Sequence, residues 1–328
     1  MRSGHAETES VGIFSGDLEA PIAILPPGTL LGSRYAIRHV LGIGGSSVVY
    51  SADDSKTLRR VAVKVLRADR STEATLARFR DEATIARELD FPHLVRGFDY
   101  AEGPPAYLTM ELASKGSLQN FIRNGRMPVA TALDIAEQVL HALTVLHDRS
   151  LLHCDVKPGN IFLDADARVL LGDFGLARPT SMHSGERGNE SVLGTLQYLA
   201  PEQALGLALD ARTDLYALGI VLFEMLTGTV PHRRASSLGT LLAHIQEPAR
   251  NVRQLRPDTP QWLARMIARL LVKKPGNRHA SAAVVLHEIE RHHGHHEPAV
   301  VVAQDQRRLD HTLVRRRALS WRLRAEMP

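Results

Sequence analysis

The chain has 328 residues, of which 44% are hydrophobic and 23% charged, as is typical of a globular protein with one large or two modest domains. Its single cysteine, Cys154, excludes an intrachain disulfide, and the N-terminus has no apolar run suited to a signal peptide, so we expect a cytoplasmic protein. The formal net charge of +4 is unevenly placed, because residues 307–324 hold seven arginines against one aspartate.

The N-terminal part of the chain is predicted to be a flexible lead-in followed by strands. Residues 1–34 are rich in Gly, Ser, Pro and Glu, and their segment LPPG breaks any helix. YAIRHVLGIG (35–44) and SSVVYSADD (46–54) then look like the two arms of a hairpin, and RRVAVKVL (59–66) is a β-branched run.

A helix and one further strand are predicted before the pattern changes. Residues 72–89 have apolar positions at helical spacing, and PPAYLTMEL (104–112) indicates a strand. The apolar positions of the helix are Leu76, Phe79, Ala83 and Ala86.

Beyond Ala113 the sequence predicts helices, over residues 130–147, 210–228 and 260–272. The first has an apolar stripe made of Ala132, Ala136, Val139, Leu143 and Leu146. The second is apolar on most of its circumference and ends at Gly228, as a buried helix capped by glycine would. Its most apolar part, LYALGIVLFEML, is too short to span a bilayer.

A glycine-rich segment lies between the arms of the predicted hairpin. Gly42, Gly44 and Gly45 there would let backbone N–H groups approach phosphate oxygens without an intervening side chain. Taken alone, such a segment is more often only a turn. A dinucleotide-binding fold is not indicated, because a strand rather than a helix follows.

Lys64 and Glu82 suggest a second element of the same site. Taken separately, Lys64 could be an ordinary lysine of an edge strand, and Glu82 could be a solvent-exposed charge on a helix. Together they could form an ion pair that holds the lysine on the α and β phosphates of a nucleotide.

Two polar segments complete the pattern. HCDVKPGN (153–160) follows a predicted helix, and GDFG (172–175) follows a short pair of predicted strands. Asn160 and Asp173 are two separated groups able to bind a metal, and with Asp155 they suit Mg²⁺-assisted phosphoryl transfer.

Taken together, these segments resemble the protein kinase superfamily, and DVKPGN with GTLQYLAPEQ (194–203) is similar to its bacterial eukaryotic-like (Hanks-type) Ser/Thr members. The resemblance implies a bilobal α+β fold over residues 35–294. It places a small β-rich N-lobe with one key helix at 35–112 and a larger helical C-lobe at 113–294. A basic tail, 295–328, would follow.

The resemblance also implies catalytic roles. Asp155 would orient the substrate hydroxyl as a base, Lys157 would stabilise the transferring phosphoryl group, and Thr195 would help align both. Asn160 and Asp173 would hold Mg²⁺ or Mn²⁺.

An ATP site is implied in the same way. Met110 matches the gatekeeper, Glu111 to Ala113 match the hinge that binds adenine, and Val49 and Ala62 would enclose the adenine ring. The full implied set is Leu41, Gly42, Gly44, Gly45, Ser47, Val49, Ala62, Lys64, Glu82, Met110, Glu111, Ala113 and Phe162.

Two structural contacts are further implied by the resemblance. Asp214 would tie the catalytic loop to the buried helix that the sequence predicts. Glu202 would pair with Arg278.

The sequence departs from the family pattern at two positions. Ser47 stands where the third loop glycine is expected, which bears on the mobility of that loop. Cys154 stands where most kinases have arginine, making this a non-RD member, and we expect it to be neither nucleophile nor metal ligand, because the reaction needs no covalent intermediate and Mg²⁺ prefers oxygen. Its lack of charge predicts high activity without phosphorylation of residues 176–199, unless Arg178 or an arginine of the 78–87 helix takes over.

We therefore expect an ATP-dependent Ser/Thr protein kinase in bacterial signalling, which phosphorylates protein substrates and itself. One alternative is a pseudokinase-like binding scaffold, against which Lys64, Asp155 and Asp173 argue. The other is a small-molecule phosphotransferase, a class that generally lacks an activation segment ending in Ala-Pro-Glu.

The sequence of the basic tail is compatible with two structures. Val314, Ala318 and Trp321 could share one face of an amphipathic helix that docks on an acidic partner or anionic lipid. A disordered basic tail fits equally well, and nucleic acid is not expected as a partner. HHGHH (292–296) is read as a solvated linker rather than a metal site.

Overall fold

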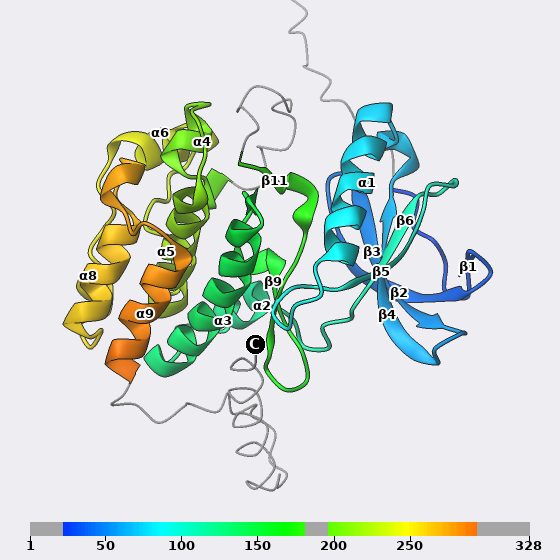
Figure 1. Ribbon diagram of the computed structural model, residues 1–328, viewed down its shortest axis with the longest axis horizontal. Helices are drawn as coiled ribbons and strands as arrows, with labels where there is room; N and C mark the ends of the chain where they lie inside the picture. Colours follow the sequence, from blue (N-terminus) through cyan, green and yellow to red (C-terminus); the bar gives the residue numbers. More distant parts are fainter. Residues whose placement is uncertain (1–21, 181–195, 294–328) are drawn as a thin grey trace, which may run out of the picture.

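The computed structural model describes residues 22–180 and 196–293, and every structural statement below concerns these residues. They form two lobes, one a β-sheet with a long helix beside it and the other mainly helical (Figure 1). The bilobal α+β fold expected from the sequence is confirmed.

The N-lobe is built on a six-stranded antiparallel sheet of order β1-β2-β3-β4-β6-β5. Its strands are β1 (Leu30–Leu31), β2 (Tyr35–Ile43), β3 (Ser47–Asp54), β4 (Arg59–Leu66), β5 (Gly97–Ala101) and β6 (Tyr107–Met110). The predicted hairpin is confirmed as β2 and β3, and the glycine-rich segment lies at its turn.

Helix α1 (Glu73–Glu88) is the one long helix of this lobe and lies against β5. Thr72 and Thr75 form a capping box at its N-terminus. Its buried face consists of Phe79, Glu82, Ala83 and Ala86. The predicted apolar face is therefore present, and it carries one carboxylate into the interior.

The other face of the sheet has an apolar core of its own, to which residues 22–31 contribute. Leu31 is buried there, and the backbone N–H of Leu25 donates to Tyr50 Oη at 3.1 Å. The predicted flexible lead-in of residues 1–34 is therefore corrected at its C-terminal end, because this segment covers aromatic side chains of the sheet. The rest of that lead-in lies outside the described residues.

The C-lobe is assembled around α5, which is buried on every side from Thr213 to Thr227. Its helices are α2 (Leu118–Arg123), α3 (Val129–Asp148), α4 (Pro201–Ala204), α5 (Ala211–Thr227), α6 (Ser237–Gln246), α7 (Val252–Leu255), α8 (Gln261–Leu270) and α9 (Ala282–His293). The three predicted helices are confirmed as α3, α5 and α8, and Gly228 ends α5 with the predicted left-handed conformation.

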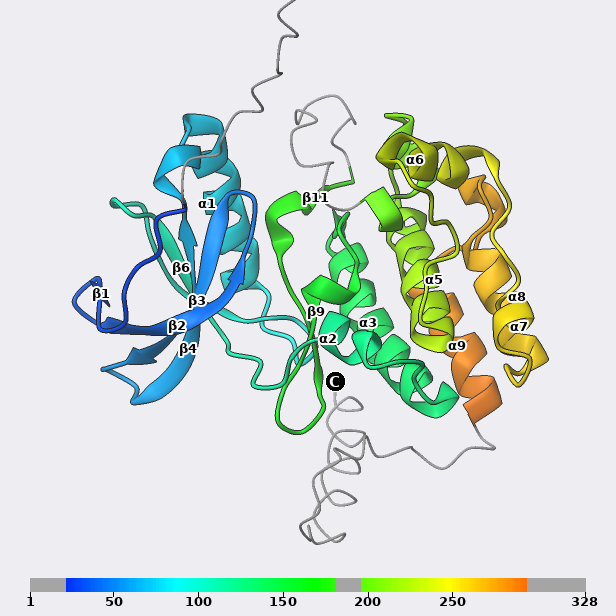
Figure 2. The same cartoon turned by 180° about the vertical axis from the view of Figure 1, so that it is seen from behind.

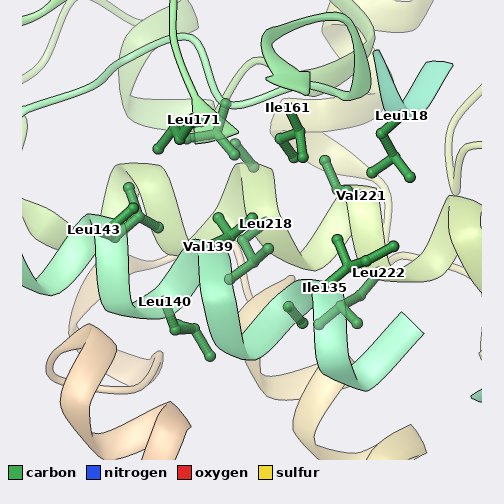
Figure 3. Close-up of a cluster of buried hydrophobic side chains, with 14 of the residues drawn as sticks. Leu118, Ile135, Val139, Leu140, Leu143, Ile161, Leu171, Leu218, Val221 and Leu222 are labelled. Atoms are coloured by element: carbon green, nitrogen blue, oxygen red, sulfur yellow. The ribbon is translucent and has the colours of Figure 1, made fainter. Parts of the chain in front are cut away.

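Short strands line the side of the C-lobe that faces the N-lobe. They are β7 (Gly116–Ser117), β8 (Leu151–Leu152), β9 (Ile161–Leu163), β10 (Val169–Leu171) and β11 (Arg178–Pro179), paired in the orders β10-β9-β7 and β11-β8. Figure 3 shows Ile161 and Leu171 over α3, and β11 lies between the lobes in Figure 1 and Figure 2. The loop between β8 and β9 is thereby fixed at both ends.

Among the described helices, only α3 is long and apolar enough to cross a membrane by length and composition. It packs against α5, α9, β8 and β10, and 56% of its most apolar window is buried. Side chains such as Val139 and Leu143 face Leu218 and Leu171 in Figure 3. This packing is that of a core helix.

Candidate active site

Lys64 lies between two carboxylates where the lobes meet. Its Nζ donates to Glu82 Oε1 at 2.6 Å and to Asp173 Oδ1 at 2.9 Å. Burial alone would lower the pKa of Lys64, but the charges of Asp173 and Glu82 outweigh it and raise that pKa above its ordinary value. The lysine therefore stays protonated and joins β4, α1 and the segment after β10.

Asp173 keeps an oxygen for further binding. The charge of Lys64 holds the pKa of Asp173 at about 2, and 40% of its side chain is exposed. A β-carbon on Gly175 would lie 3.4 Å from both Asp173 Oδ1 and Glu82 Oε2. Gly175 therefore lies directly beside both carboxylates that bind Lys64.

The two carboxylate oxygens of Asp155 differ in their hydrogen bonding. Its Oδ2 accepts from Lys157 Nζ at 2.7 Å and from Asn160 Nδ2 at 2.8 Å, whereas Oδ1 is buried and has no hydrogen-bond partner within residues 22–180 and 196–293. Burial raises the pKa of Asp155, and the Lys157 ammonium opposes that rise. A carboxylate in this state can accept a proton from a hydroxyl group beside it.

Asp214, in the first turn of α5, fixes the backbone of the same loop. Its Oδ2 accepts from the His153 backbone N–H at 2.9 Å, and its Oδ1 accepts from that of Cys154 at 2.8 Å. His147 Nε2 pairs with Oδ2 at 2.8 Å. The expected tie between the catalytic loop and the buried helix is observed, and it holds Cys154 in the left-handed region with φ 62°.

Asn160 and Asp173 fit a divalent cation. The Asn160 carbonyl accepts from the Gly172 N–H at 3.0 Å, which places Asn160 next to the residue before Asp173. Its Nδ2 is used on Asp155, so its side-chain oxygen is left as a ligand. Such oxygens suit Mg²⁺ or Mn²⁺. Within the described residues no group of three or more His, Cys, Asp or Glu could hold a metal, so nucleotide oxygens would have to complete the site.

A hydrogen bond closes the glycine-rich turn, and free space remains beside two of its glycines. The Gly44 N–H donates to the Ser47 carbonyl at 2.8 Å, and Ser47 is buried. A β-carbon on Gly42 or Gly45 would meet no atom within 4 Å. Serine at the third glycine position is therefore accommodated without covering the N–H groups of the turn.

Arg67 holds the tip of this turn, and sequence reasoning missed it. Its backbone N–H donates to the Ser46 carbonyl at 2.9 Å, and its Nη1 donates to that of Gly45 at 3.3 Å. Asp69 binds the guanidinium at Nε and Nη2, at 3.1 and 2.7 Å. In the sequence, the only indication of this role is that Arg67 directly follows β4, the strand that carries Lys64.

The residues implied for adenine lie on neighbouring strands. Val49 is paired with Lys64, and Ala62 with Met110. The Glu111 side chain accepts from an arginine of the C-lobe, which fastens the hinge. Three further members of the implied set are Leu41 on β2, Ala113 at the end of the hinge and Phe162 on β9.

Cys154 lies beside a buried arginine from another strand. Arg178 begins β11 and is aligned with Leu152 of β8. Its guanidinium lies close enough to act on the Cys154 thiol, while its Nε and Nη2 are buried with no hydrogen-bond partner among the residues that the structure describes. Burial raises the pKa of the thiol, which suits the expectation that Cys154 is neither nucleophile nor metal ligand. Arg178, one of the two replacements considered for the missing arginine, therefore lies near Cys154.

One predicted site residue cannot be placed. Thr195, expected to help align the catalytic loop, lies outside the described residues, as does the basic tail. The expected pair of Glu202 and Arg278 is present and buried, with nitrogen–oxygen distances of 2.7 and 2.8 Å.

Comparison with known proteins agrees with this arrangement. The sequence profile of the protein kinase domain matches residues 35–289, and the chain therefore belongs to the protein kinase family. It is 37% identical to the probable serine/threonine-protein kinase CA_C1728 of Clostridium acetobutylicum over 265 residues, and 36% identical to PknB of Mycobacterium leprae over 275. It is also 37% identical to PrkC of Bacillus subtilis over 258 residues.

These matches cover most of this chain but less than half of each relative. They include 80%, 82% and 78% of the present sequence, and 40%, 44% and 40% of the three relatives. What is shared is therefore the kinase domain.

Proposed function

We propose that this chain is a bacterial, ATP-dependent Ser/Thr protein kinase that transfers the γ-phosphoryl group of ATP to serine and threonine hydroxyls of proteins. The observation that carries the proposal is the state of Asp155, whose Oδ1 has no partner among the described residues and whose Oδ2 is held by Lys157 and Asn160. An acceptor hydroxyl donating to Oδ1 would be oriented for attack and would have a base for its proton.

Positioning and charge account for most of phosphoryl-transfer catalysis. Lys64, held by Glu82, would bind the α and β phosphates beneath the glycine-rich turn. Lys157 would offset the charge of the transferring group beside Asp155. Bound Mg²⁺ or Mn²⁺ would neutralise phosphate charge, and Asn160 with Asp173 would hold it.

Ser/Thr specificity is supported by similarity. The relatives named above are called serine/threonine-protein kinases, and Lys157 with the segment GTLQYLAPEQ resembles that branch. The pseudokinase-like alternative is not favoured, because Lys64, Asp155 and Asp173 are all present and Lys64 is paired with both Glu82 and Asp173.

The test is transfer of radiolabelled γ-phosphate to a generic protein acceptor. Asp155→Asn and Asp173→Asn should each lower the rate at least ~10²-fold, and Asp166→Asn, on an exposed turn, should not. Phosphoamino-acid analysis should yield phosphoserine and phosphothreonine. Predominant phosphotyrosine, or near-normal turnover in the site variants, would contradict the proposal.

We further propose that the catalytic domain spans residues 35–294 and that residues 22–34 form an ordered part of its N-lobe. A cytoplasmic location and autophosphorylation are consistent with the proposed signalling role. An acidic partner or anionic lipid is proposed for the basic tail on the strength of its arginine content alone.

A further inference from the structure

Lys273 ends in a cluster of polar side chains against the buried face of α6. Its Nζ lies 3.2 Å from Tyr216 Oη on α5, 3.2 Å from His232 Nε2 before α6, and 3.5 Å from the Ala243 carbonyl on α6. The tyrosine and the histidine are almost fully buried. An ammonium group has three protons to donate, and these three contacts use all of them.

The charges around the cluster do not neutralise this ammonium group. The Arg278 guanidinium lies over the ring of the same tyrosine, with its Cζ 4.7 Å from the ring centroid, and is paired with Glu202. Glu247, beyond the end of α6, is paired with Arg234. Burial and the charge of Arg278 therefore lower the pKa of Lys273 to about 8, although the Glu247 charge opposes them.

The two histidines of the cluster are neutral at the pH where Lys273 changes its charge. Burial and the charge of Lys273 lower the pKa of His232 to about 3 and that of His244 to about 4. His232 also faces the charges of Arg234 and Arg250, which act in the same direction. Within this cluster, the proton of Lys273 is therefore the one that is lost just above neutral pH.

The protonated lysine fixes the direction of a hydrogen-bond chain. Because an ammonium group only donates, Tyr216 must turn its own proton toward His244 Nδ1, at 3.1 Å. His244 then carries its proton on Nε2, which is buried and forms no hydrogen bond of ordinary geometry with a described residue. The Gln197 backbone lies close enough to oppose the lowering of the His244 pKa by burial. A neutral lysine could accept the tyrosine proton instead, which would reverse the chain and take the proton from Nε2.

Gln197 belongs to a segment that is fastened to the catalytic loop. It lies in the 3₁₀ turn Leu196–Tyr198, which packs against α5 and α6. Further along this segment, Gln203 Nε2 donates to the Cys154 carbonyl at 3.0 Å, directly before Asp155. A shift of the segment would therefore be transmitted to the backbone that positions Asp155.

We propose that Lys273 is a positioning residue, whose proton holds residues 196–203 against the catalytic loop through Tyr216 and His244. The functional part of this inference rests on the proposed kinase activity. Loss of the proton should lower kcat, yet it removes a buried charge and should stabilise the fold. Rate and stability should therefore respond in opposite directions to rising pH, whereas alkaline unfolding would lower both.

The stability part can be tested without any enzymatic activity. Because the pKa of Lys273 is about 8 in the native protein against an ordinary value of 10.5, the unfolded chain binds more protons between these values. The free energy of unfolding in urea should therefore rise with pH in the wild type relative to Lys273→Met. Lys274→Met, which changes the exposed neighbour, should behave as the wild type.

Hydrogen exchange reports on the segment itself. At about pH 7 the backbone amides of residues 196–203 should exchange about fivefold faster in Lys273→Met than in the wild type, as expected for loss of one hydrogen bond. Tyr216→Phe keeps the lysine and breaks only the chain, so it should have the same effect. Lys274→Met should have none. A thermal shift with Mg²⁺-ATP shows that each variant is folded, and if Tyr216→Phe does not fold, Lys273→Met carries the test.

The kinetic test is kcat at saturating Mg²⁺-ATP and acceptor. In the wild type and in Lys274→Met it should fall about fivefold as pH rises through about 8. In Lys273→Met and Tyr216→Phe it should be low and constant over this range, whereas Lys273→Arg, which stays charged, should keep its rate.

An alkaline fall in kcat that persists in Lys273→Met and Tyr216→Phe would overturn the proposal. Unchanged exchange of residues 196–203 in both variants would do the same. Absence of any phosphoryl transfer in the wild type would contradict the kinase assignment, while the unfolding and exchange measurements would still decide whether Lys273 holds the segment.

Discussion

Two opposing influences act on Asp155, and they predict how activity depends on pH. Burial raises the pKa of this carboxyl, and the Lys157 ammonium at 2.7 Å lowers it. A base acts only when ionised, so the rate should fall as pH decreases through that pKa. Once protonated, the Asp155 carboxyl can no longer accept a proton from the substrate hydroxyl. The decrease in rate therefore lies on the acidic side of the pH profile.

Lys157→Met removes the opposing charge, and the pKa of Asp155 should rise further. We expect the acidic limb of the kcat–pH profile to move to higher pH and the rate at its plateau to fall about 10²-fold. The measurement is kcat at saturating Mg²⁺-ATP across the pH range. Lys56→Met, an exposed lysine of the N-lobe, serves as the control. An unmoved limb would show that the Lys157 charge does not act on Asp155.

Much of the candidate site could be predicted because its residues belong to short segments with distinctive chemistry. Lys64, Glu82 and Asp173 were identified this way, and they meet in the structure. The position of Arg178 beside Cys154 was only one of two alternatives. It depends on pairing between two-residue strands, which have no periodicity to read.

At the scale of elements, the glycine-rich turn depends on a contact from the end of β4. Arg67 reaches the Gly45 carbonyl, and Asp69 orients its guanidinium. Arg67→Ala should loosen the turn and raise KM for ATP about fivefold, with a smaller effect on kcat, since one hydrogen bond contributes ~1 kcal/mol. Steady-state kinetics with varied ATP provide the measurement.

The matched control for Arg67 is Arg70→Ala, in the exposed 3₁₀ turn that follows. Arg67→Lys keeps the charge but loses the fork held by Asp69, so it should restore KM only in part. Equal changes in KM for Arg67→Ala and Arg70→Ala would contradict this role.

Helices α5 and α8 approach closely at Gly219. A β-carbon there would lie 2.8 Å from Leu270 Cβ and 3.1 Å from Leu271 Cδ2. Alanine favours a helix by ~1 kcal/mol over glycine, but overpacking costs ~1–3 kcal/mol. We expect Gly219→Ala to lower the free energy of unfolding by up to ~2 kcal/mol in urea denaturation, the difference between these two effects. Gly276→Ala, where a β-carbon meets no atom within 4 Å, should be neutral.

The long helices were predictable from periodicity, whereas the packing of residues 22–31 against the N-lobe sheet was not. Helices α3 and α5 present apolar patterns over many residues, and both follow the predicted ranges closely. Strand β1 has two residues and follows a Pro-Pro-Gly break. Only the packed sheet shows that Leu31 and Leu25 are needed against its outer face.

At the scale of the whole molecule, the two lobes meet through Lys64. The lysine comes from β4 and Glu82 from α1, while Asp173 belongs to the segment after β10. The same contact that would bind ATP phosphates therefore sets how α1 lies against the C-lobe. Glu82 and Asp173 act on one ammonium, so a change at either should affect both lobes.

The kinase-domain match ends before the basic tail, and this predicts that the tail is separable from catalysis. Deleting residues 297–328 should leave the phosphoryl-transfer rate within about twofold. Binding of the full chain to anionic vesicles should fall with salt, because exposed charges are screened over ~8 Å at physiological ionic strength. The measurements are the transfer rate and vesicle co-sedimentation.

A full-length variant with the seven tail arginines replaced by glutamine separates charge from chain length. It should lose vesicle binding and keep the transfer rate. An inactive or unstable truncation would instead show that the tail packs on the catalytic domain.

The single cysteine also makes the protein a reporter of its own unfolding. Thiolates react with alkylating and disulfide reagents, whereas Cys154 is half-buried and desolvation raises the pKa of its thiol, which therefore stays neutral. Labelling of the native protein should therefore be much slower than in denaturant. Because α5 fixes the Cys154 backbone through Asp214, the labelling rate should measure how often the C-lobe opens.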